Sequence, residues 1–225
     1  MRHIGLIAFN NVTQLDLTAP HEVFSRFPDA RISIIAETLE PIISEKGFRF
    51  LPDATFENTP QLDIIFVPGG PGISDAIENK KLMNFLVQQA HKAQYITSVC
   101  TGALILAQAG LLDGFKATTH WLSLDLLRLH KKVKTIEKRV VVDKNRITGG
   151  GVTAGIDMAL VLAEKIYGLE VAQNIQLMIE YNPKPPFKSG SPKLALPAVV
   201  EKIKSERKTI QEKRRDRILK MMNEN

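Results

Sequence analysis

The feature that most constrains the fold is a series of short apolar runs that are rich in β-branched side chains. Leu62–Val67 is the clearest of them, and it ends at the sequence Pro-Gly-Gly-Pro-Gly that begins at Pro68. Runs of about four to eight residues are too short for most helices, and strands buried on both faces of a sheet have this continuous apolar character. We therefore predict buried strands over His3–Phe9, Arg31–Ala36, Leu62–Val67 and Tyr95–Val99.

Segments with helical spacing of apolar residues lie between these runs. In Lys80–Lys92, for example, the apolar residues recur at intervals of three and four positions. Helices are predicted over Leu15–Phe27, Lys80–Lys92, Thr101–Ala109, Trp121–Leu129, Thr153–Tyr167 and Glu170–Tyr181. Alternating strands and helices predict an α/β fold with a mostly parallel sheet covered on both faces, a flavodoxin-like three-layer α/β/α sandwich.

Two shorter β segments complete this prediction. Phe48–Leu51 alternates in polarity, which is typical of an edge strand or a hairpin arm. Arg139–Val142 and Arg146–Thr148 flank the turn sequence Asp143-Lys-Asn, so we expect them to form a hairpin.

The basic charge of the chain is concentrated in its last 42 residues. The net charge is +6, but residues 184–225 carry 12 Lys or Arg against five Asp or Glu, so residues 1–183 are close to neutral. Pro183–Pro197 contains five prolines and should cross the surface as an extended arm, and Val199–Met221 has the spacing of a final helix. We predict a catalytic domain over 1–183, extended by this arm and basic helix over 184–225, the helix packing on the domain or on a second subunit.

The tail offers no recognisable nucleic-acid module. A helix-turn-helix needs a second helix, which the segment after Pro197 is too short to supply. We therefore expect no nucleic-acid partner.

Cysteine usage and hydropathy exclude several other classes. Cys100 is the single cysteine, which excludes an intramolecular disulfide framework and a multi-cysteine zinc site and fits a reducing, cytoplasmic compartment. No His, Asp and Glu have metal-ligand spacing, so we expect no metal or other cofactor. Ile4–Phe9 is too short to be the apolar region of a signal peptide. Ala93–Leu112 is uncharged, but it contains polar residues and two glycines, which predicts a strand and a helix rather than a membrane span.

Cys100 lies where a parallel sheet places its ligands. It follows the strand Tyr95–Val99 and precedes the helix that begins at Thr101. Ligands bind beyond the carboxyl ends of such strands, and a residue in this strand–helix turn is a nucleophile elbow that projects into a cleft. We expect the helix N-terminus to lower the pKa of the thiol. The alternative is that Cys100 is a small buried apolar residue.

The residues around Cys100 resemble the ThiJ/PfpI superfamily, part of the class I glutamine-amidotransferase-like fold. Ser98–Ala103 resembles its nucleophile motif, Val67–Gly70 its oxyanion loop and Gly149–Asp157 its later glycine-rich turn. Within the superfamily the chain is most similar to the isonitrile hydratases, over about residues 3 to 195. Leu15–Pro20 matches their N-terminal motif, and Glu180–Phe187 resembles their distinctive arm.

This resemblance implies a small-molecule isonitrile substrate, hydrated to an N-substituted formamide, and a homodimer. It implies that Cys100 is the nucleophile, that Thr101 assists it, and that Asp16 is the acid–base group. Gly69 and Gly70, with the N–H of Thr101, are expected to stabilise developing charge. His120 and Gly150 are expected on the substrate side of the cleft. Ala19 and Asn182 depart from the usual glycine and aspartate, which concerns substrate fit rather than chemistry.

Simpler roles are open for several of these residues. Asp16 is also suited to be a helix N-cap, Thr101 to a local hydrogen bond, and His120 to a structural hydrogen bond. The Gly149-Gly-Gly turn lacks a phosphate-binding pattern, so close backbone packing beside the nucleophile is the better interpretation.

Two other functions are open within the same superfamily. One is a ligand-sensing domain related to AraC-type regulators, and the other is a glyoxalase-like stress enzyme. The latter pairs its cysteine with a glutamate, for which Glu22 is available. Cysteine proteases and amidotransferases of this fold commonly place a histidine directly after the nucleophile, where this chain has Thr101.

Overall fold

The computed structural model describes residues 1–223, which form an α/β fold around one seven-stranded sheet. Across the sheet, the strands are β10 (Val140–Asp143), β11 (Arg146–Gly149), β7 (Tyr95–Val99), β6 (Ile64–Val67), β1 (Arg2–Ile7), β2 (Ala30–Ala36) and β5 (Ala54–Thr55). All neighbouring strands are parallel except β10 and β11, which form the predicted hairpin at one edge. The predicted α/β class with a mostly parallel sheet is confirmed.

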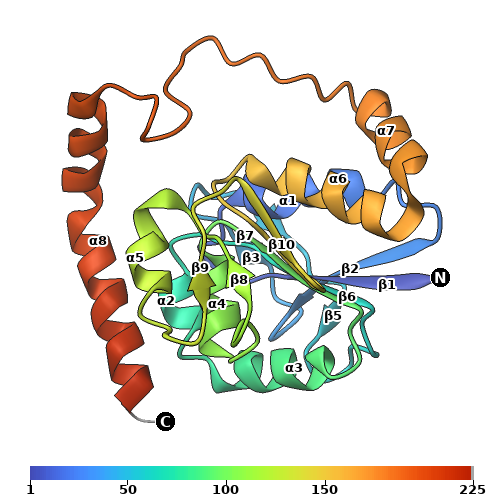
Figure 1. Cartoon of the computed structure of the whole chain (residues 1–225). Coiled ribbons are helices and arrows are strands. Elements are labelled where there is room, and N and C mark those ends of the chain that lie inside the picture. The colour runs from blue at the N-terminus through green and yellow to red at the C-terminus, as the bar shows by residue number, and fades with distance from the viewer. Residues whose placement is uncertain (224–225) are drawn as a thin grey trace.

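Helices cover both faces of this sheet (Figure 1). One face is covered by α1 (Gln14–Phe24), α6 (Ala154–Tyr167) and α7 (Leu169–Met178). The other face is covered by α2 (Ile73–Ala76), α3 (Lys80–Ala90), α4 (Gly102–Gln108) and α5 (Leu124–Leu127). The three-layer arrangement follows from strands that are apolar along their whole length, because both faces of each strand must then be buried.

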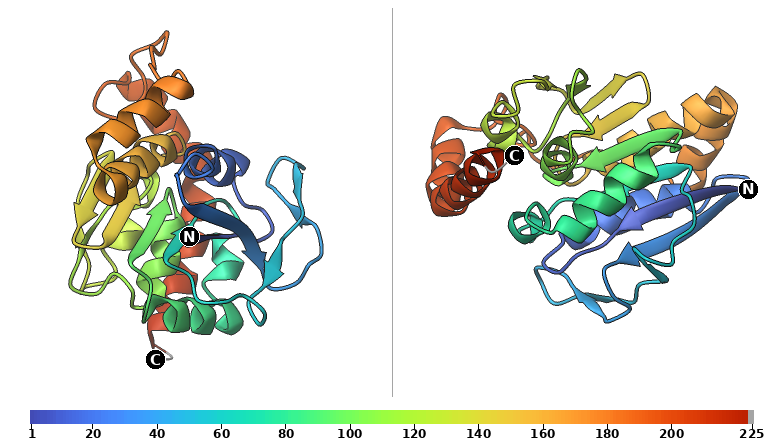
Figure 2. Two further views of the ribbon diagram at one scale, coloured as in Figure 1. Left: turned by 90° about the vertical axis from the view of Figure 1, so that its right-hand side faces the viewer. Right: turned by 90° about the horizontal axis from the view of Figure 1, so that it is seen from below.

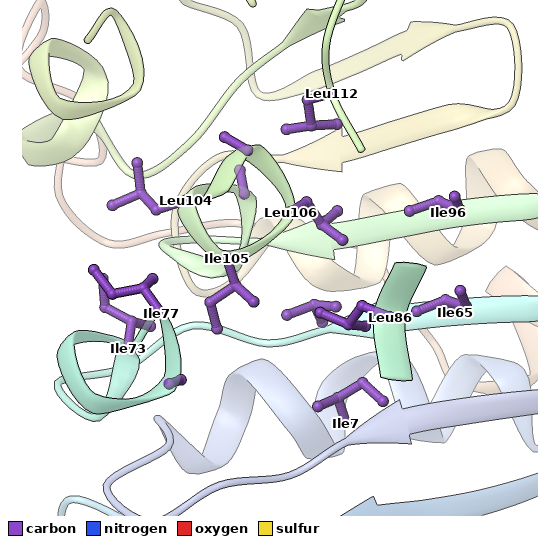
Figure 3. Close-up of a cluster of buried hydrophobic side chains, with 14 of the residues drawn as sticks. Ile7, Ile65, Ile73, Ile77, Leu86, Ile96, Leu104, Ile105, Leu106 and Leu112 are labelled. Carbon is purple, nitrogen blue, oxygen red and sulfur yellow. The ribbon is translucent and has the colours of Figure 1, made fainter. Parts of the chain in front are cut away.

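Successive residues of the central strands enter two separate hydrophobic cores. In β6, Ile64 and Phe66 pack with α1 and α6, whereas Ile65 and Val67 pack with α3 and α4. Figure 3 shows the second core, in which Ile7, Ile65 and Ile96 extend from three strands. Complete burial of such a side chain contributes about 1.5–3 kcal/mol, so the two cores hold the carboxyl ends of the strands in fixed positions.

The sequence predicts the smaller elements less accurately than the central strands. β3 (Ile42–Ile43) and β4 (Arg49–Phe50) form a hairpin, which confirms the hairpin alternative for Phe48–Leu51. β8 (Lys116–Ala117) and β9 (Lys134–Thr135) form a parallel pair that the sequence did not indicate. The helical prediction for Trp121–Leu129 is confirmed over residues 121–127, where a 3-10 turn, η1 (Trp121–Ser123), precedes the short α5.

The tail returns to the body of the molecule as one long helix. Residues 179–196 leave α7 as an extended arm and reach α8 (Pro197–Asn223), which runs along the outside of the domain beside α5 (Figures 1 and 2). α8 packs on α5 and η1 of its own chain and buries Val200, Arg214 and Ile218. The division at residue 183 stays a prediction. Over the described residues, no helix is both long and apolar enough to cross a membrane.

Candidate active site

The elbow predicted at Cys100 is a tight turn between β7 and α4. Cys100 has a φ of +54°, a left-handed backbone conformation that residues with side chains rarely adopt. Its N–H donates to the Gly149 carbonyl at 3.1 Å, and its carbonyl accepts from Thr119 Oγ1 at 2.8 Å. These bonds fix the turn from two sides, and strained backbone of this kind clusters at functional sites.

The side chain of Asp16, in the first turn of α1, is completely buried beside Cys100. Its Oδ2 accepts a hydrogen bond from the Gly69 N–H at 2.9 Å, whereas Oδ1 has no partner among the described residues. Burial raises the pKa of Asp16 to about 7, while the Gly69 N–H and the Cys100 side chain oppose the rise and the charge of Glu45 adds to it. Asp16 therefore gains and loses a proton near neutral pH, as a general acid–base group must.

Asp16 does not act as the N-cap of its helix. Thr13 occupies that position in α1, and the hydrogen bond of Asp16 crosses to Gly69 in a different part of the chain. The capping alternative raised by the sequence is therefore wrong. The position of Asp16 serves the site rather than the helix.

The protonation of Cys100 differs from the sequence-based expectation. Burial raises the pKa of the thiol well above its ordinary value, and the neighbouring charge of Asp16 raises it further. The N–H of Thr101 at the start of α4 lowers the pKa, as expected, but this effect is smaller. The expectation of a lowered pKa is wrong, because the cost of desolvating an anion exceeds the stabilisation from one helix end.

The loop after β6 connects two of the three predicted catalytic residues, Asp16 and Thr101. The Gly69 N–H donates to Asp16, and the Gly70 N–H donates to Thr101 Oγ1 at 3.0 Å. The N–H groups of Gly69 and Gly70, predicted to stabilise developing charge, thus bond to the side chains of two predicted catalytic residues. Thr101, which is buried, thus bonds across to the loop rather than within its own turn.

Gly69 is placed where no side chain fits. A Cβ at this position would lie 2.5 Å from the Thr101 nitrogen and 2.9 Å from Asp16 Oδ2, both far inside van der Waals contact. The absence of a side chain allows the loop to approach both residues closely. The glycines of the Pro-Gly-Gly sequence are therefore required by packing as well as by the turn.

His120 and Gly150 line a cavity of about 430 Å³ next to the elbow. Thr119 also lines it, and its hydroxyl bonds to the Cys100 carbonyl. The arm closes the opposite side with residues 190–193, so the arm and the glycine-rich turn form one concave surface. The other lining residues are Thr118, Trp121, Leu124, Glu137, Lys138, Arg139, Gly151, Val152 and Thr153.

The ring of His120 also has a structural hydrogen bond. Its Nδ1 accepts from the Leu122 N–H at 3.3 Å, which caps η1. Burial lowers the pKa of His120 to about 4, and the charges of Arg214 and Arg207 contribute. The ring is therefore neutral at physiological pH and presents Nε2 rather than a charge.

Gly149 is the residue of the triple-glycine turn that packs tightly beside the nucleophile. Its carbonyl accepts from Cys100, and a Cβ here would lie 3.2 Å from both the Ala154 carbonyl and the Val99 side chain. Close packing is thus confirmed for Gly149. Gly150 has more space and faces the cavity.

Three residues near the site were not singled out by the sequence. Thr119 fixes the elbow carbonyl, Glu45 raises the pKa of Asp16, and Arg214 of α8 donates through Nη2 to the Gly70 carbonyl at 3.1 Å. Thr119 directly precedes His120, which the sequence analysis had identified, so the sequence indicated its neighbourhood. Glu45 and Arg214 carry no local signal, because only the tertiary fold brings them to this loop.

Glu22, the glutamate required by the glyoxalase-like alternative, is on the outer face of α1. Its side chain is 58% exposed and pairs with Arg26 on the same helix at 2.7 Å. It therefore lies outside the site. Within residues 1–223, no group of three or more His, Cys, Asp or Glu side chains is arranged to hold a metal ion.

Known proteins resemble this chain in sequence and in fold. The model of the DJ-1/PfpI family matches residues 2–165. The isonitrile hydratase of Pseudomonas putida is 48% identical over 198 residues, which cover 88% of this chain and 86% of that protein. The HTH-type transcriptional regulator GbdR of Pseudomonas aeruginosa is 35% identical over 136 residues, 60% of this chain but 37% of the regulator.

The fold also has a solved counterpart. The crystal structure of a ThiJ/PfpI family protein from Pseudomonas syringae superimposes with a TM-score of 0.93 at 38% identity. The match covers 96% of this chain and 90% of that one. The tail of the chain thus falls largely within the matched part of the structure.

Proposed function

Since the chain belongs to the DJ-1/PfpI family, we propose that it is an isonitrile hydratase, which adds water to an isonitrile to give an N-substituted formamide. The observation that carries the proposal is the pair formed by the strained Cys100 and the buried Asp16. A cysteine nucleophile and a neighbouring carboxyl group would supply an attacking atom and a proton to the same substrate carbon. The terminal carbon of an isonitrile requires both.

The resting site holds its proton on sulfur. Because the thiol pKa is well above its ordinary value and that of Asp16 is about 7, the thiol is protonated near neutral pH and Asp16 is divided between its two forms. The ionised carboxylate accepts the thiol proton as the sulfur approaches the substrate. A free thiolate is not needed beforehand.

The first half of the reaction adds the thiol across the isonitrile carbon. The S–H bond breaks, the proton passes to Asp16, and a C–S bond forms. Asp16 then delivers the same proton to that carbon, forming a C–H bond and a covalent thioimidate, with the carboxylate restored. One group thus acts as base and acid in turn, which its pKa near neutrality allows.

The second half hydrolyses the thioimidate. Asp16 takes a proton from water while the oxygen bonds to the carbon, and the proton passes to the substrate nitrogen. The C–S bond then breaks, the remaining hydroxyl proton returns to sulfur, and the N-substituted formamide leaves. The balance is one isonitrile and one water to one formamide, with no oxidant or reductant.

The surrounding groups have defined tasks in this scheme. The Gly69 N–H fixes the side chain of Asp16, and the Gly70 N–H fixes that of Thr101, the residue after Cys100. The loop thereby keeps Asp16 and the elbow in a fixed relative position. The cavity lined by His120 and Gly150 accommodates the substituent on the substrate nitrogen. A neutral His120 suits an uncharged substituent.

The decisive experiment is incubation of the purified protein with cyclohexyl isocyanide and detection of N-cyclohexylformamide. Turnover is expected in the wild type and is expected to be lost in Cys100→Ser and in Asp16→Asn while both variants stay folded. Full activity in Cys100→Ser would overturn the mechanism. Absence of turnover over a panel of alkyl and aryl isonitriles would overturn the assignment.

A ligand-sensing role is the second candidate, and the similarity to the regulator GbdR favours it. A sensor binds a small molecule without consuming it. Stable binding of an isonitrile with no formamide released would therefore support the sensor over the hydratase.

We also propose that the chain forms a homodimer, as the resemblance implies, and that it is cytoplasmic, as its single cysteine indicates. Sedimentation equilibrium tests the first statement, because a dimer has twice the 25.1 kDa of one chain. Fractionation of cells tests the second.

A further inference from the structure

The basic tail contributes one residue to the interior of the site. Arg214 lies in α8, 144 residues after Gly70, and only 6% of it is exposed. Its Nη2 donates to the Gly70 carbonyl, and its Nε is buried with no hydrogen-bond partner in the described chain. The other basic residues that α8 presents lie mostly at the surface.

The burial of this guanidinium is not compensated by an ion pair. Over residues 1–223, the ion pairs formed by α8 involve Lys204, Lys208 and Arg217, and Arg214 takes part in none. Removing a charge from water without a charged partner costs several kcal/mol, so folds rarely keep such a group without a functional reason. Arg217, three positions along and 39% exposed, pairs instead with Asp75 and Glu78.

The groups that interact with Arg214 belong to the site. Burial lowers the pKa of Arg214, whereas the charge of Cys100 opposes this; Arg207 adds to the lowering and Glu45 opposes it. Arg214 in turn favours the neutral form of His120. The interaction between two charges is one energy shared by both groups. A positive charge on Arg214 therefore favours the thiolate form of Cys100, as the thiolate favours the charged form of Arg214.

The hydrogen bond of Arg214 acts on the loop that holds the catalytic residues. Gly70 has a φ of +145°, which few residues adopt, and its N–H orients Thr101. The neighbouring N–H, of Gly69, orients Asp16. A rigid, planar guanidinium on the Gly70 carbonyl thus fixes a loop whose two N–H groups set the position of both side chains.

We propose that Arg214 is a positioning residue of the active site, which fixes the Gly70 peptide from the C-terminal helix and supplies the positive charge that faces the Cys100 thiolate. The inference deepens the proposed function and rests on it for the reaction that the thiolate carries out. In this scheme α8 is part of the catalytic apparatus, and its packing on the domain is coupled to the reactivity of the sulfur.

The single cysteine allows a test that does not depend on the substrate. The thiolate absorbs near 240 nm, so a pH titration of the full-length protein, with Cys100→Ser subtracted as baseline, reports the ionisation of Cys100 alone. In Arg214→Met we expect the titration to move to higher pH and the rate of alkylation by iodoacetamide at fixed pH to fall about tenfold or more. The substitution keeps the length of the side chain, and thermal unfolding verifies the fold.

Two further variants separate charge from position. Arg214→Lys keeps the charge but not the planar fork, so it should restore most of the titration and only part of kcat with cyclohexyl isocyanide. Arg217→Met removes a charge from the same helix at the surface, and should leave the titration, alkylation and kcat close to those of the wild type. If Arg214→Met does not fold, the thiolate titration and kcat of Arg214→Lys are compared with those of the wild type.

The outcomes are distinct. A thiolate titration in Arg214→Met that matches the wild type, or a shift of equal size in Arg217→Met, would overturn the inference. The inference would also be overturned if Arg214→Lys kept the full kcat while its thiolate titrated at the same pH as that of Arg214→Met. If the wild type does not hydrate isonitriles, the proposed function fails, yet the titration and alkylation still decide the role of Arg214.

Discussion

Replacing the buried acid of the site should stabilise the protein while abolishing its chemistry. Asp16 has a pKa of about 7 in the folded chain against an ordinary 3.8, because burial disfavours the carboxylate. A carboxyl group with a raised pKa binds its proton more tightly in the folded chain than in the unfolded one. Its contribution to stability is therefore fully present below pH 3.8 and is lost as the pH rises towards 7.

The magnitude follows from the same two values. Each pKa unit corresponds to about 1.4 kcal/mol, so above pH 7 the ionised Asp16 costs the folded state up to about 4 kcal/mol. Asparagine carries no charge at any of these pH values, and its amide oxygen can still accept from the Gly69 N–H. The amide N–H₂ of asparagine is a new buried donor, which offsets part of this gain. We therefore expect the free energy of unfolding of Asp16→Asn to exceed that of the wild type by about 2–4 kcal/mol at pH 8.

Urea unfolding of both proteins between pH 4 and pH 8 measures this difference. The gain should shrink steadily as the pH falls through 7 and should be small or absent near pH 4. Asp125→Asn is the matched control, because that carboxylate is 81% exposed and pairs only with Arg128 on the surface, so its effect should stay within about 1 kcal/mol. A variant no more stable than the wild type at pH 8, or a gain independent of pH, would refute the reasoning.

Three further outcomes are expected. Gly69→Ala should lower kcat at least about tenfold with a smaller change in KM, measured with cyclohexyl isocyanide, since the added methyl group would lie 2.5 Å from the Thr101 nitrogen. His120→Gln should leave the kcat–pH profile unchanged above pH 5, because the pKa of His120 is about 4 and the ring is already neutral there. Ile218→Ala should cost about 2–5 kcal/mol in urea unfolding, since that side chain of α8 is fully buried in a hydrophobic core; a loss below 1 kcal/mol would mean that α8 contributes little to the fold.

The sequence predicts the sheet and the elbow well for a physical reason. Strands such as β6 and β7 are apolar along their length, and this pattern is local, so it is visible without the fold. Because parallel strands end at one edge, the position of Cys100 followed from chain order alone. The two-residue strands β8 and β9 were missed because two residues have no periodicity.

The features that the sequence did not predict depend on contacts between residues that are far apart in the chain. The helix end beside Cys100 is a local feature and predicts a lowered pKa, but the burial that reverses the shift comes from elements far away in the chain. The same holds for Arg214, which reaches the site only because the arm carries α8 back over the domain. The basic composition of the tail gave no indication that one of its cations is buried.

The raised pKa values of Cys100 and Asp16 suit an isonitrile better than a preformed thiolate would. An attacking thiolate creates negative charge on the same carbon that must then receive a proton. A site that holds one mobile proton between the sulfur and the carboxyl group therefore supplies the nucleophile and the acid together. A histidine beside the cysteine, as in related amidotransferases, would instead favour a permanent ion pair. Thr101 at that position, held by Gly70, leaves the sulfur protonated until substrate enters, and the positive charge of Arg214 then favours the thiolate that forms.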